Sequence, residues 1–256
     1  MTNNDLFRRW YPLYYDRRDT QTYDIELFEE LLEGRQKVFE ICCGTGRILL
    51  PLAKRGHEMN GIDMDKNMLA RLMEKAEGIE NIHLIKGNAE TCEWGQGYDA
   101  VIMAGNIVMN IDGSDDPIRT QKAFVKKSYD ALKEGGLFIM DNDCWKHPED
   151  FFKNRSEPVI KDLGTDQNGV SAKIIYVWST YDSDTQMCIN LNRRELTAPD
   201  GEKRITEKKY VNHIPTRAQM TGWAKDAGFT ILNEWGDYYR NPVTDETHRL
   251  VILAKK

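Results

Sequence analysis

The sequence predicts an α/β protein built on a doubly wound, mostly parallel sheet of seven strands, with an antiparallel β insertion after the fifth strand. Three observations predict this class. Apolar runs of strand length alternate with segments of helical period between residues 37 and 141. The first of these runs ends in a glycine turn, as βαβ units that bind a nucleoside do. After residue 150 the helical segments give way to extended runs separated by turn signals.

The elements follow in order. The first helix is expected to end at Gly34, and Asp65 is placed to cap the helix that follows the second strand. Pro117 stands at the start of a long helix, where a missing N–H costs nothing. Strands alternating with helices in this way predict a parallel sheet covered on both faces. The expected helices are 22–32, 47–55, the segment after Asp65 and 117–132, and the expected strands are 37–42, 58–63, 82–86, 98–104 and 137–141.

The remainder of the chain predicts an insertion and then the end of the sheet. Three extended runs, 171–180, 187–197 and 205–214, are separated by turn residues and form an antiparallel meander. Thr216 and Gln219 have the spacing of a capping box for a helix that ends before Gly228. Residues 229–235 and 248–254 would form a terminal antiparallel pair. We therefore expect one domain from 1–150 and 215–256, and an insertion, 151–214, that covers the active site.

Composition limits the possible functions. The 256 residues carry a net charge of −6 and no long basic stretch, which argues against a nucleic acid partner. The first residues lack the apolar core of a signal peptide, and no apolar run is long enough for a membrane span, so we expect a cytoplasmic protein without a membrane contact. Five cysteines without paired spacing indicate free thiols, and no Cys/His spacing suggests a metal.

The most informative stretch is the glycine turn after the first strand. Residues 38–46 read Val-Phe-Glu-Ile-Cys-Cys-Gly-Thr-Gly, and Asp63 ends the second strand 19 residues after Gly44. A dinucleotide site needs a third glycine three residues after Gly46, but Leu49 stands there. Glu40 would also repel a pyrophosphate, whereas it suits a cation. The stretch therefore favours a cationic nucleoside over NAD, with a glycine turn that binds no ligand as the plain alternative.

This spacing resembles the class I S-adenosylmethionine (SAM)-dependent methyltransferases, whose first motif is Asp/Glu-x-x-x-Gly-x-Gly. Nearly the whole chain is similar to their small-molecule subgroup, which includes the N,N-dimethyltransferases of nucleotide-linked aminosugars and, more distantly, glycine N-methyltransferase. The resemblance implies a Rossmann-like fold, SAM as cofactor and S-adenosylhomocysteine as product. Its local matches are Tyr14-Tyr15-Asp16, residues 40–46, residues 132–138 and Ala227-Gly228-Phe229 followed by two strands.

The resemblance implies a set of cofactor residues around the glycine turn. Glu40 would accept from the amino group of SAM, and Asp63 would accept from both ribose hydroxyls. Gly44 and Gly46 would let the backbone approach the cofactor, because a Cβ would collide. Thr45 and the first helical N–H groups would bind the methionine carboxylate. The other expected cofactor residues are Tyr15, Cys42, Met64, Met68, Asn88, Ala89, Glu90, Ala104 and Asn106.

Three of these expectations concern particular chemistry. Met64 and Met68 would flank the adenine, although Met at this spacing is also ordinary core. Asn88 stands where related enzymes carry an acid for the adenine amino group, and its carbonyl oxygen can still accept. Cys42 and its neighbour Cys43 are interpreted as small residues tolerated in a tight turn.

The sequence is less informative on the acceptor side. The aminosugar enzymes use a His after the fourth strand, but the matching position here is Asn110, so that role does not transfer. The catalytic residues are unassigned, with Tyr14, Asn110, His147 and His213 as candidates, and the general base cannot be named. Tyr14 and Tyr15 would fold over SAM as a lid. The expected acceptor-binding residues are Tyr14, Asn110, Asn142, Trp145, Trp178 and Arg194, with Tyr176 beside the last two on the insertion.

We therefore interpret the chain as a SAM-dependent methyltransferase that acts on an amine or hydroxyl of a small molecule, with an amine favoured, and that works as a monomer or homodimer. An NAD-dependent dehydrogenase is disfavoured by the missing glycine. A non-catalytic SAM-binding module that regulates a partner stays open. A methyltransferase of macromolecules is disfavoured by the acidic charge and by Ala-Gly-Asn-Ile at residues 104–107, where nucleobase and glutamine enzymes carry Pro-Pro.

Overall fold

The computed structural model describes residues 3–18, 20–111, 116–152 and 154–256, and it divides the chain into two compact units. The parallel-sheet unit consists of Tyr15–Lys146 and Pro215–Lys256. The antiparallel unit consists of His147–Ile214 together with the chain up to Tyr14. Each unit is described by itself. Among the described residues, no helix combines the length and the apolar character that crossing a membrane requires.

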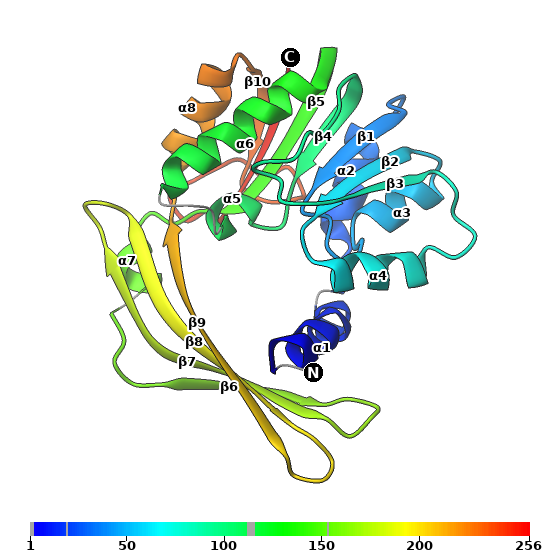
Figure 1. The fold of residues 1–256 in the computed structure, drawn as a ribbon. Coiled ribbons are helices and arrows are strands. Elements are labelled where there is room, and N and C mark those ends of the chain that lie inside the picture. Colours follow the sequence, from blue (N-terminus) through cyan, green and yellow to red (C-terminus); the bar gives the residue numbers. More distant parts are fainter. Residues whose placement is uncertain (1–2, 19, 112–115, 153) are drawn as a thin grey trace. The chain divides into compact units, whose positions relative to one another are not determined.

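The parallel-sheet unit contains the seven-stranded sheet that the sequence predicts (Figure 1). Its strand order is β10-β11-β5-β4-β1-β2-β3. Strands β1 to β5 pair in parallel, whereas β11 runs antiparallel to both of its neighbours, β5 and β10. The strands are β1 (Lys37–Ile41), β2 (Glu58–Asp63), β3 (Ile82–Lys86), β4 (Tyr98–Met103), β5 (Leu132–Asp143), β10 (Thr230–Trp235) and β11 (Arg249–Lys255).

Helices cover both faces of this sheet, which makes the fold doubly wound. Helices α2 and α3 pack on one face, where Phe28 and Leu49 join a core with Val38 and Ile102. Helices α6 and α8 pack on the other face, as Figure 1 shows. The helices are α2 (Tyr23–Leu31), α3 (Leu49–Lys54), α4 (Lys66–Lys75), α5 (Ile107–Asn110), α6 (Pro117–Ala131) and α8 (Arg217–Ala227).

Local signals explain most of the element ends. Helix α8 has the predicted capping box, in which Thr216 accepts from the Gln219 N–H and the Gln219 side chain accepts from the Thr216 N–H. Helix α3 begins at Leu49 rather than at the expected Arg47. Pro51 has no N–H, so it is tolerated only in the first turn of a helix, and this delays the start.

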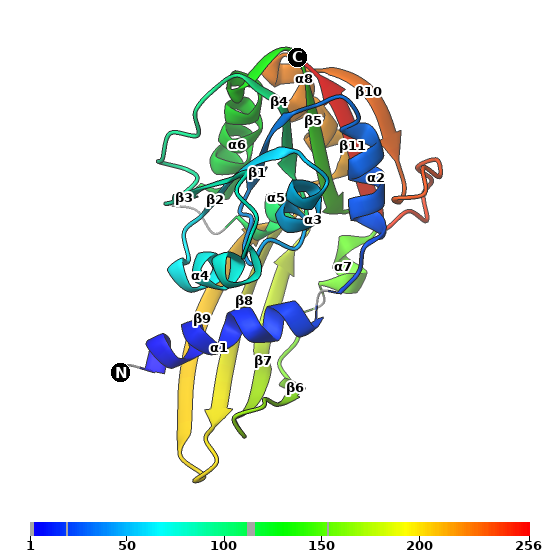
Figure 2. The same cartoon turned by 90° about the vertical axis from the view of Figure 1, so that its right-hand side faces the viewer.

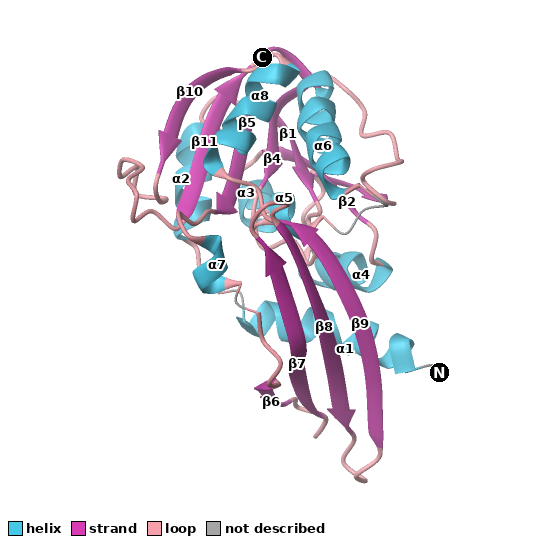
Figure 3. Ribbon diagram, turned by 90° about the vertical axis from the view of Figure 1, so that its left-hand side faces the viewer, coloured by secondary structure: helices cyan, strands magenta, loops and turns pink. Residues whose placement is uncertain are grey.

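The antiparallel unit contains a four-stranded sheet in the order β6-β7-β8-β9 (Figure 3). The three expected runs became β7 (Ser171–Asp182), β8 (Met187–Thr197) and β9 (Lys203–His213). The fourth strand, β6 (Val159–Thr165), was missed. Its residues are exposed except for the partly buried Leu163. A strand without a buried face needs no alternation of apolar and polar residues, so its sequence carries no pattern that predicts a strand.

Helix α1 (Asn3–Arg18) lies across the strands of the antiparallel sheet in Figures 2 and 3. Phe7, Trp10 and Tyr14 are buried in one cluster with Ala172 and Leu196. This helix was not predicted, because its sequence has a weak helical period and carries Pro12 in its interior. A short helix, α7 (Pro148–Phe151), precedes β6.

Candidate functional site

The turn after β1 is built from left-handed backbone. Cys42 and Gly44 both have φ 55°, and Gly46 has φ 80°. Cys42 is not a glycine, so its conformation stores strain of about 1–3 kcal/mol. Strain of this kind persists where the surrounding structure fixes the backbone, and it is common at binding sites.

Asp63, at the end of β2, holds this turn in place. Its Oδ2 accepts from the Gly44 N–H at 2.9 Å, and its Oδ1 accepts from the Asp65 N–H at 2.8 Å. Burial raises the pKa of Asp63, and these two backbone hydrogen bonds oppose that change. Each carboxylate oxygen has a second lone pair, so Asp63 can accept further hydrogen bonds from a ligand.

Glu40, on β1, carries a buried oxygen without a partner. The residue is 6% exposed, and its Oε2 has no hydrogen bond within the described part of the chain. Burial raises the pKa of Glu40 to about 8, against the opposing effect of the Arg47 charge. Buried polar atoms are normally bonded, so this oxygen marks a place for a cationic or donating group.

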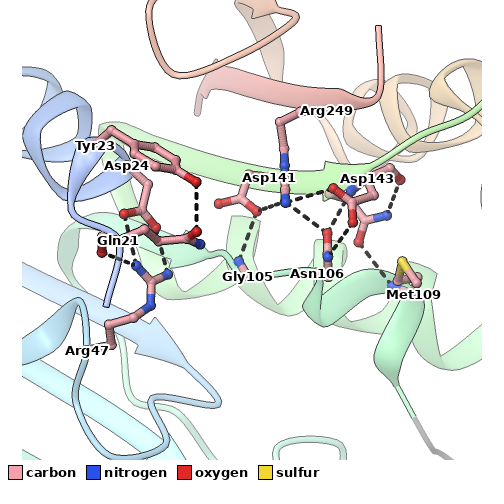
Figure 4. Close-up of polar contacts among 11 residues, drawn as sticks. Gln21, Tyr23, Asp24, Arg47, Gly105, Asn106, Met109, Asp141, Asp143 and Arg249 are labelled. Carbon is pink, nitrogen blue, oxygen red and sulfur yellow. Dashed lines mark hydrogen bonds and ion pairs between the residues drawn. The ribbon is translucent and has the colours of Figure 1, made fainter. Parts of the chain in front are cut away.

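Arg47, after the glycine turn, is committed to another carboxylate. Its Nη1 and Nη2 donate to Asp24 Oδ1 and Oδ2 at 2.9 and 2.6 Å, and Asp24 is fully buried (Figure 4). A bidentate pair of this kind fixes both groups. Gln21 accepts from Arg47 through its backbone carbonyl and from Tyr23 through its side chain, as Figure 4 shows.

The two glycines of the turn have different reasons to be glycine. A Cβ on Gly46 would lie 2.8 Å from Leu72 Cγ and 2.9 Å from Leu50 Cγ, so the core under the turn requires this residue. A Cβ on Gly44 would make only ordinary contacts, with Met68 Cε at 3.4 Å and the Cys42 carbonyl oxygen at 4.0 Å. We expected both glycines to serve the approach of a cofactor. For Gly46, packing against α3 and α4 is sufficient reason.

Asp16, near the end of α1, binds the glycine turn through Thr45, a contact that was not predicted from the sequence. Its Oδ1 accepts from Thr45 Oγ1 and from Lys75 Nζ, both at 2.7 Å, and its Oδ2 accepts from Arg71 Nε at 2.8 Å. Burial alone would raise the pKa of Asp16, but these bonds lower it. Thr45, expected to bind a carboxylate, therefore already donates its hydroxyl. Tyr15 is partly buried beside Asp16.

The segment after β3 is held by its own side chains and by α6. Asn88 Oδ1, expected to bind adenine, accepts from the Glu90 N–H at 2.8 Å. The Ala89 carbonyl accepts from Trp94 Nε1 at 2.9 Å and from Lys127 Nζ at 2.7 Å. Glu90 Oε1 accepts from a hydroxyl on α6. Among the side chains, Asn88 Oδ1 still has a free lone pair for a ligand.

A polar network lies where β4 and β5 end and β11 begins (Figure 4). Arg249 Nη1 donates to Asp141 Oδ1 and to Asn106 Oδ1, both at 2.9 Å, and Arg249 Nη2 pairs with Asp143 at 2.7 Å. Asn106 has left-handed backbone, with φ 66°. Asp141 also accepts from the Gly105 N–H at 2.9 Å. Arg249 therefore fixes the segment after β4, where Ala104 and Asn106 were expected to contact the cofactor.

The remaining candidates of this unit are more scattered. Asn142 is buried and accepts from the Met109 N–H at 3.2 Å. Asn110 is exposed at the end of α5, and Trp145 is partly buried after β5. Met64, expected beside the adenine, is 71% exposed, whereas Met68 is buried.

The candidate bases of the antiparallel unit have structural partners. His213 is 1% exposed, and its Nε2 lies 3.1 Å from Gln186 Oε1. His147 Nδ1 lies 3.2 Å from Glu149 Oε1, on a largely exposed side chain. Tyr14 is buried and stacks on Trp10 with ring centroids 5.2 Å apart. The role of Tyr14 as a lid over SAM stays a prediction, and in this structure the Tyr14 side chain is packed against Trp10.

A β-bulge separates two residues that we expected to act together. Tyr176 pairs with Asn192, and Trp178 pairs with Leu191, so Val177 is an extra residue in β7. Paired residues share a face of the sheet, and successive residues alternate. Tyr176 therefore shares the face of Arg194, whereas Trp178 lies on the opposite face.

The thiols near the turn are poor nucleophiles. Burial, with the charges of Asp63 and Glu40, raises the pKa of Cys42 to about 12. The same causes raise the pKa of Cys43. Both thiols therefore stay protonated at neutral pH, which agrees with a packing role.

Comparison with known proteins gives three findings. A family model described as a methyltransferase domain matches residues 38–136. A protein of Geobacillus sp. (strain WCH70), named as a candidate methyltransferase, is 26% identical over 88% of this chain and 86% of its own length. Two solved structures share the fold. One is a SAM-dependent methyltransferase from Clostridium acetobutylicum, with a TM-score of 0.72 and 18% identity over 94% of this chain and 95% of that chain. The other is SAM-bound CalS10, an amino pentose methyltransferase from Micromonospora echinaspora, with a TM-score of 0.67 and 19% identity over 96% of this chain and 95% of that chain.

The matched domain contains the glycine turn, Glu40 and Asp63, and the seven-stranded sheet has the architecture of the Rossmann-like methyltransferases. The chain thus carries a methyltransferase domain of the Rossmann-like class. The family match and the relative named as a methyltransferase support a SAM-dependent methyltransferase.

Proposed function

We propose that the enzyme transfers the methyl group of SAM to an amine, or to a hydroxyl, of a small molecule. The observation that carries the acceptor class is the likeness to CalS10, an amino pentose methyltransferase, over 96% of this chain, antiparallel strands included. The net charge of −6 gives no electrostatic attraction for a nucleic acid acceptor.

The residues around the glycine turn fit this cofactor. Glu40 offers an unbonded, buried oxygen to the ammonium of SAM, and Asp63 offers two free lone pairs to the ribose hydroxyls. Backbone N–H groups of the left-handed turn suit the methionine carboxylate. SAM supplies an activated methyl group on a sulfonium, so the protein needs no covalent nucleophile.

The chain's own residues then position the cofactor. Arg249 and Asp141 fix the segment that carries Ala104 and Asn106, which we propose as contacts of the cofactor. Fixed positions of this kind convert a bimolecular displacement into one within a complex. An acceptor amine must lose a proton, and we assign no base.

The test is the release of S-adenosylhomocysteine from SAM with a panel of small amines, aminosugars, phenols and carboxylic acids. We expect turnover with amines, and loss of turnover in Asp63→Ala. SAM binding without turnover on any small acceptor would contradict the proposal and favour a SAM-binding regulatory module. Turnover on RNA or a protein alone would favour a macromolecular acceptor.

A further inference from the structure

One face of the antiparallel sheet gathers polar groups beside α1. Alternate residues of β8 share this face, and one of them, Leu196, is buried in one cluster with Trp10 of α1. Asn192 and Arg194 precede Leu196 on the same face. Because residues two apart along a strand are about 7 Å apart, their side chains can reach one small molecule.

Arg194 is a cation without a carboxylate. Its Nη2 donates to the Tyr210 hydroxyl at 2.8 Å, and its guanidinium lies 5.2 Å from the centre of the Tyr11 ring. Across the described residues, no acidic side chain lies within 4.0 Å of it. By contrast Arg193, on the opposite face of the strand, pairs with Glu207 at 2.7 Å. Neutral partners hold Arg194 in place and leave its charge and most of its five N–H donors for a ligand.

Two further polar atoms of this unit are buried and unbonded in the part of the chain that the structure describes. Asn192 Oδ1 is an acceptor on the face of Arg194, and Trp10 Nε1 is a donor on α1, on a residue that is only 8% exposed. More than nine in ten buried polar groups have a partner, so two such atoms in one unit need an explanation. A bound molecule that offers both an acceptor and a donor would satisfy them.

We propose that this face binds a small molecule that carries an anionic group, either a carboxylate or a phosphate, and an N–H or O–H donor. Arg194 binds the anion, Trp10 donates to the molecule and Asn192 accepts from it. This binding does not depend on the function proposed above.

The experiment is isothermal titration of the full chain with benzoate and, separately, with inorganic phosphate. We expect one of the two to bind with 1:1 stoichiometry. Binding of benzoate alone identifies the anion as a carboxylate, and binding of phosphate alone identifies it as a phosphate. Arg194→Met should weaken that binding about tenfold or more, the effect of losing a charge-assisted hydrogen bond. The matched control is Arg193→Met, one residue away on the opposite face, which should stay within about twofold because an exposed ion pair contributes little.

Two variants guard against a change in folding. Arg194→Lys keeps the charge and should retain most of the binding, while Asn192→Asp places a negative charge on the same face and should weaken it. The proposal is overturned if neither anion binds the wild type, or if Arg194→Met and Asn192→Asp bind as Arg193→Met does. SAM titration of the same samples separates the two proposals: the anion site should change while SAM affinity does not.

Discussion

Replacing Glu40 by Gln should stabilise the protein without cofactor and at the same time weaken SAM binding. The pKa of Glu40 rises from 4.5 to about 8 on folding, chiefly because of burial. Between these pH values the folded state holds a proton that the unfolded state releases, so the free energy of unfolding falls as the pH rises from 4.5 to 8. At 1.36 kcal/mol per pKa unit, the largest loss is about 5 kcal/mol, reached above pH 8. Gln does not titrate and avoids this loss.

Binding should change in the opposite direction. The SAM ammonium favours ionised Glu40, so SAM affinity should increase as the pH rises from 6 toward the pKa of Glu40 at about 8. Gln keeps the shape but loses the charge, which should weaken binding by about 1.5–3 kcal/mol, or roughly 10- to 150-fold.

The assays are urea unfolding without cofactor at pH 6 and pH 8.5, and isothermal titration with SAM. The control is Glu77→Gln, an exposed residue that should change neither quantity. We expect the stability gain of Glu40→Gln to be larger at pH 8.5 than at pH 6. An equal gain at both values would show that Glu40 does not titrate between them, and unchanged SAM affinity would remove Glu40 from the cofactor site.

Four other substitutions test the structure. Asp63→Ala should weaken SAM binding by about 1–3 kcal/mol in titrations of a folded variant, and unchanged affinity would contradict the ribose assignment. Gly46→Ala should lower the free energy of unfolding by about 1–3 kcal/mol in urea, because of its positive φ and the close leucine contacts; a neutral result would mean that the core can shift. Arg249→Met should cost about 3–5 kcal/mol in the same assay, since it leaves a buried carboxylate without its cation, whereas the exposed Arg217→Met should cost about 1 kcal/mol or less. Asp16→Asn should destabilise the protein at neutral pH but not at acid pH, because stability from a carboxyl with a lowered pKa is lost as the pH falls through its folded pKa; an equal effect at both pH values would exclude this linkage.

The sequence predicted those parts of the fold that have a local signal. The glycine turn, the capping box of Thr216 and the apolar runs of the parallel sheet all lie within short stretches, and each formed as expected. Helix α1 and strand β6 were missed because their stability depends on distant residues rather than on their own periodicity.

The residues of the site likewise fall into those with a local sequence signal and those without one. Asp63 and Gly44 are linked through one βαβ unit, so their spacing was readable. Arg249 meets Asp141 only because β11 inserts beside β5, and no spacing rule connects residues so far apart. The face of the sheet on which Trp178 lies was unpredictable for a different reason. One extra residue in a strand moves every following side chain to the opposite face of the sheet.

The place of α1 has a consequence for how the chain is made. Its Phe7, Trp10 and Tyr14 are synthesised well before their packing partners, because more than 150 residues separate Tyr14 from Ala172, and Leu196 follows later still. Until then this helix exposes apolar surface and can pair with wrong partners. The core of the antiparallel unit can therefore form completely only after Leu196 has been synthesised. A chain truncated before Leu196 should leave its first helix a target for chaperones or proteases, however well the β1–β5 region has formed.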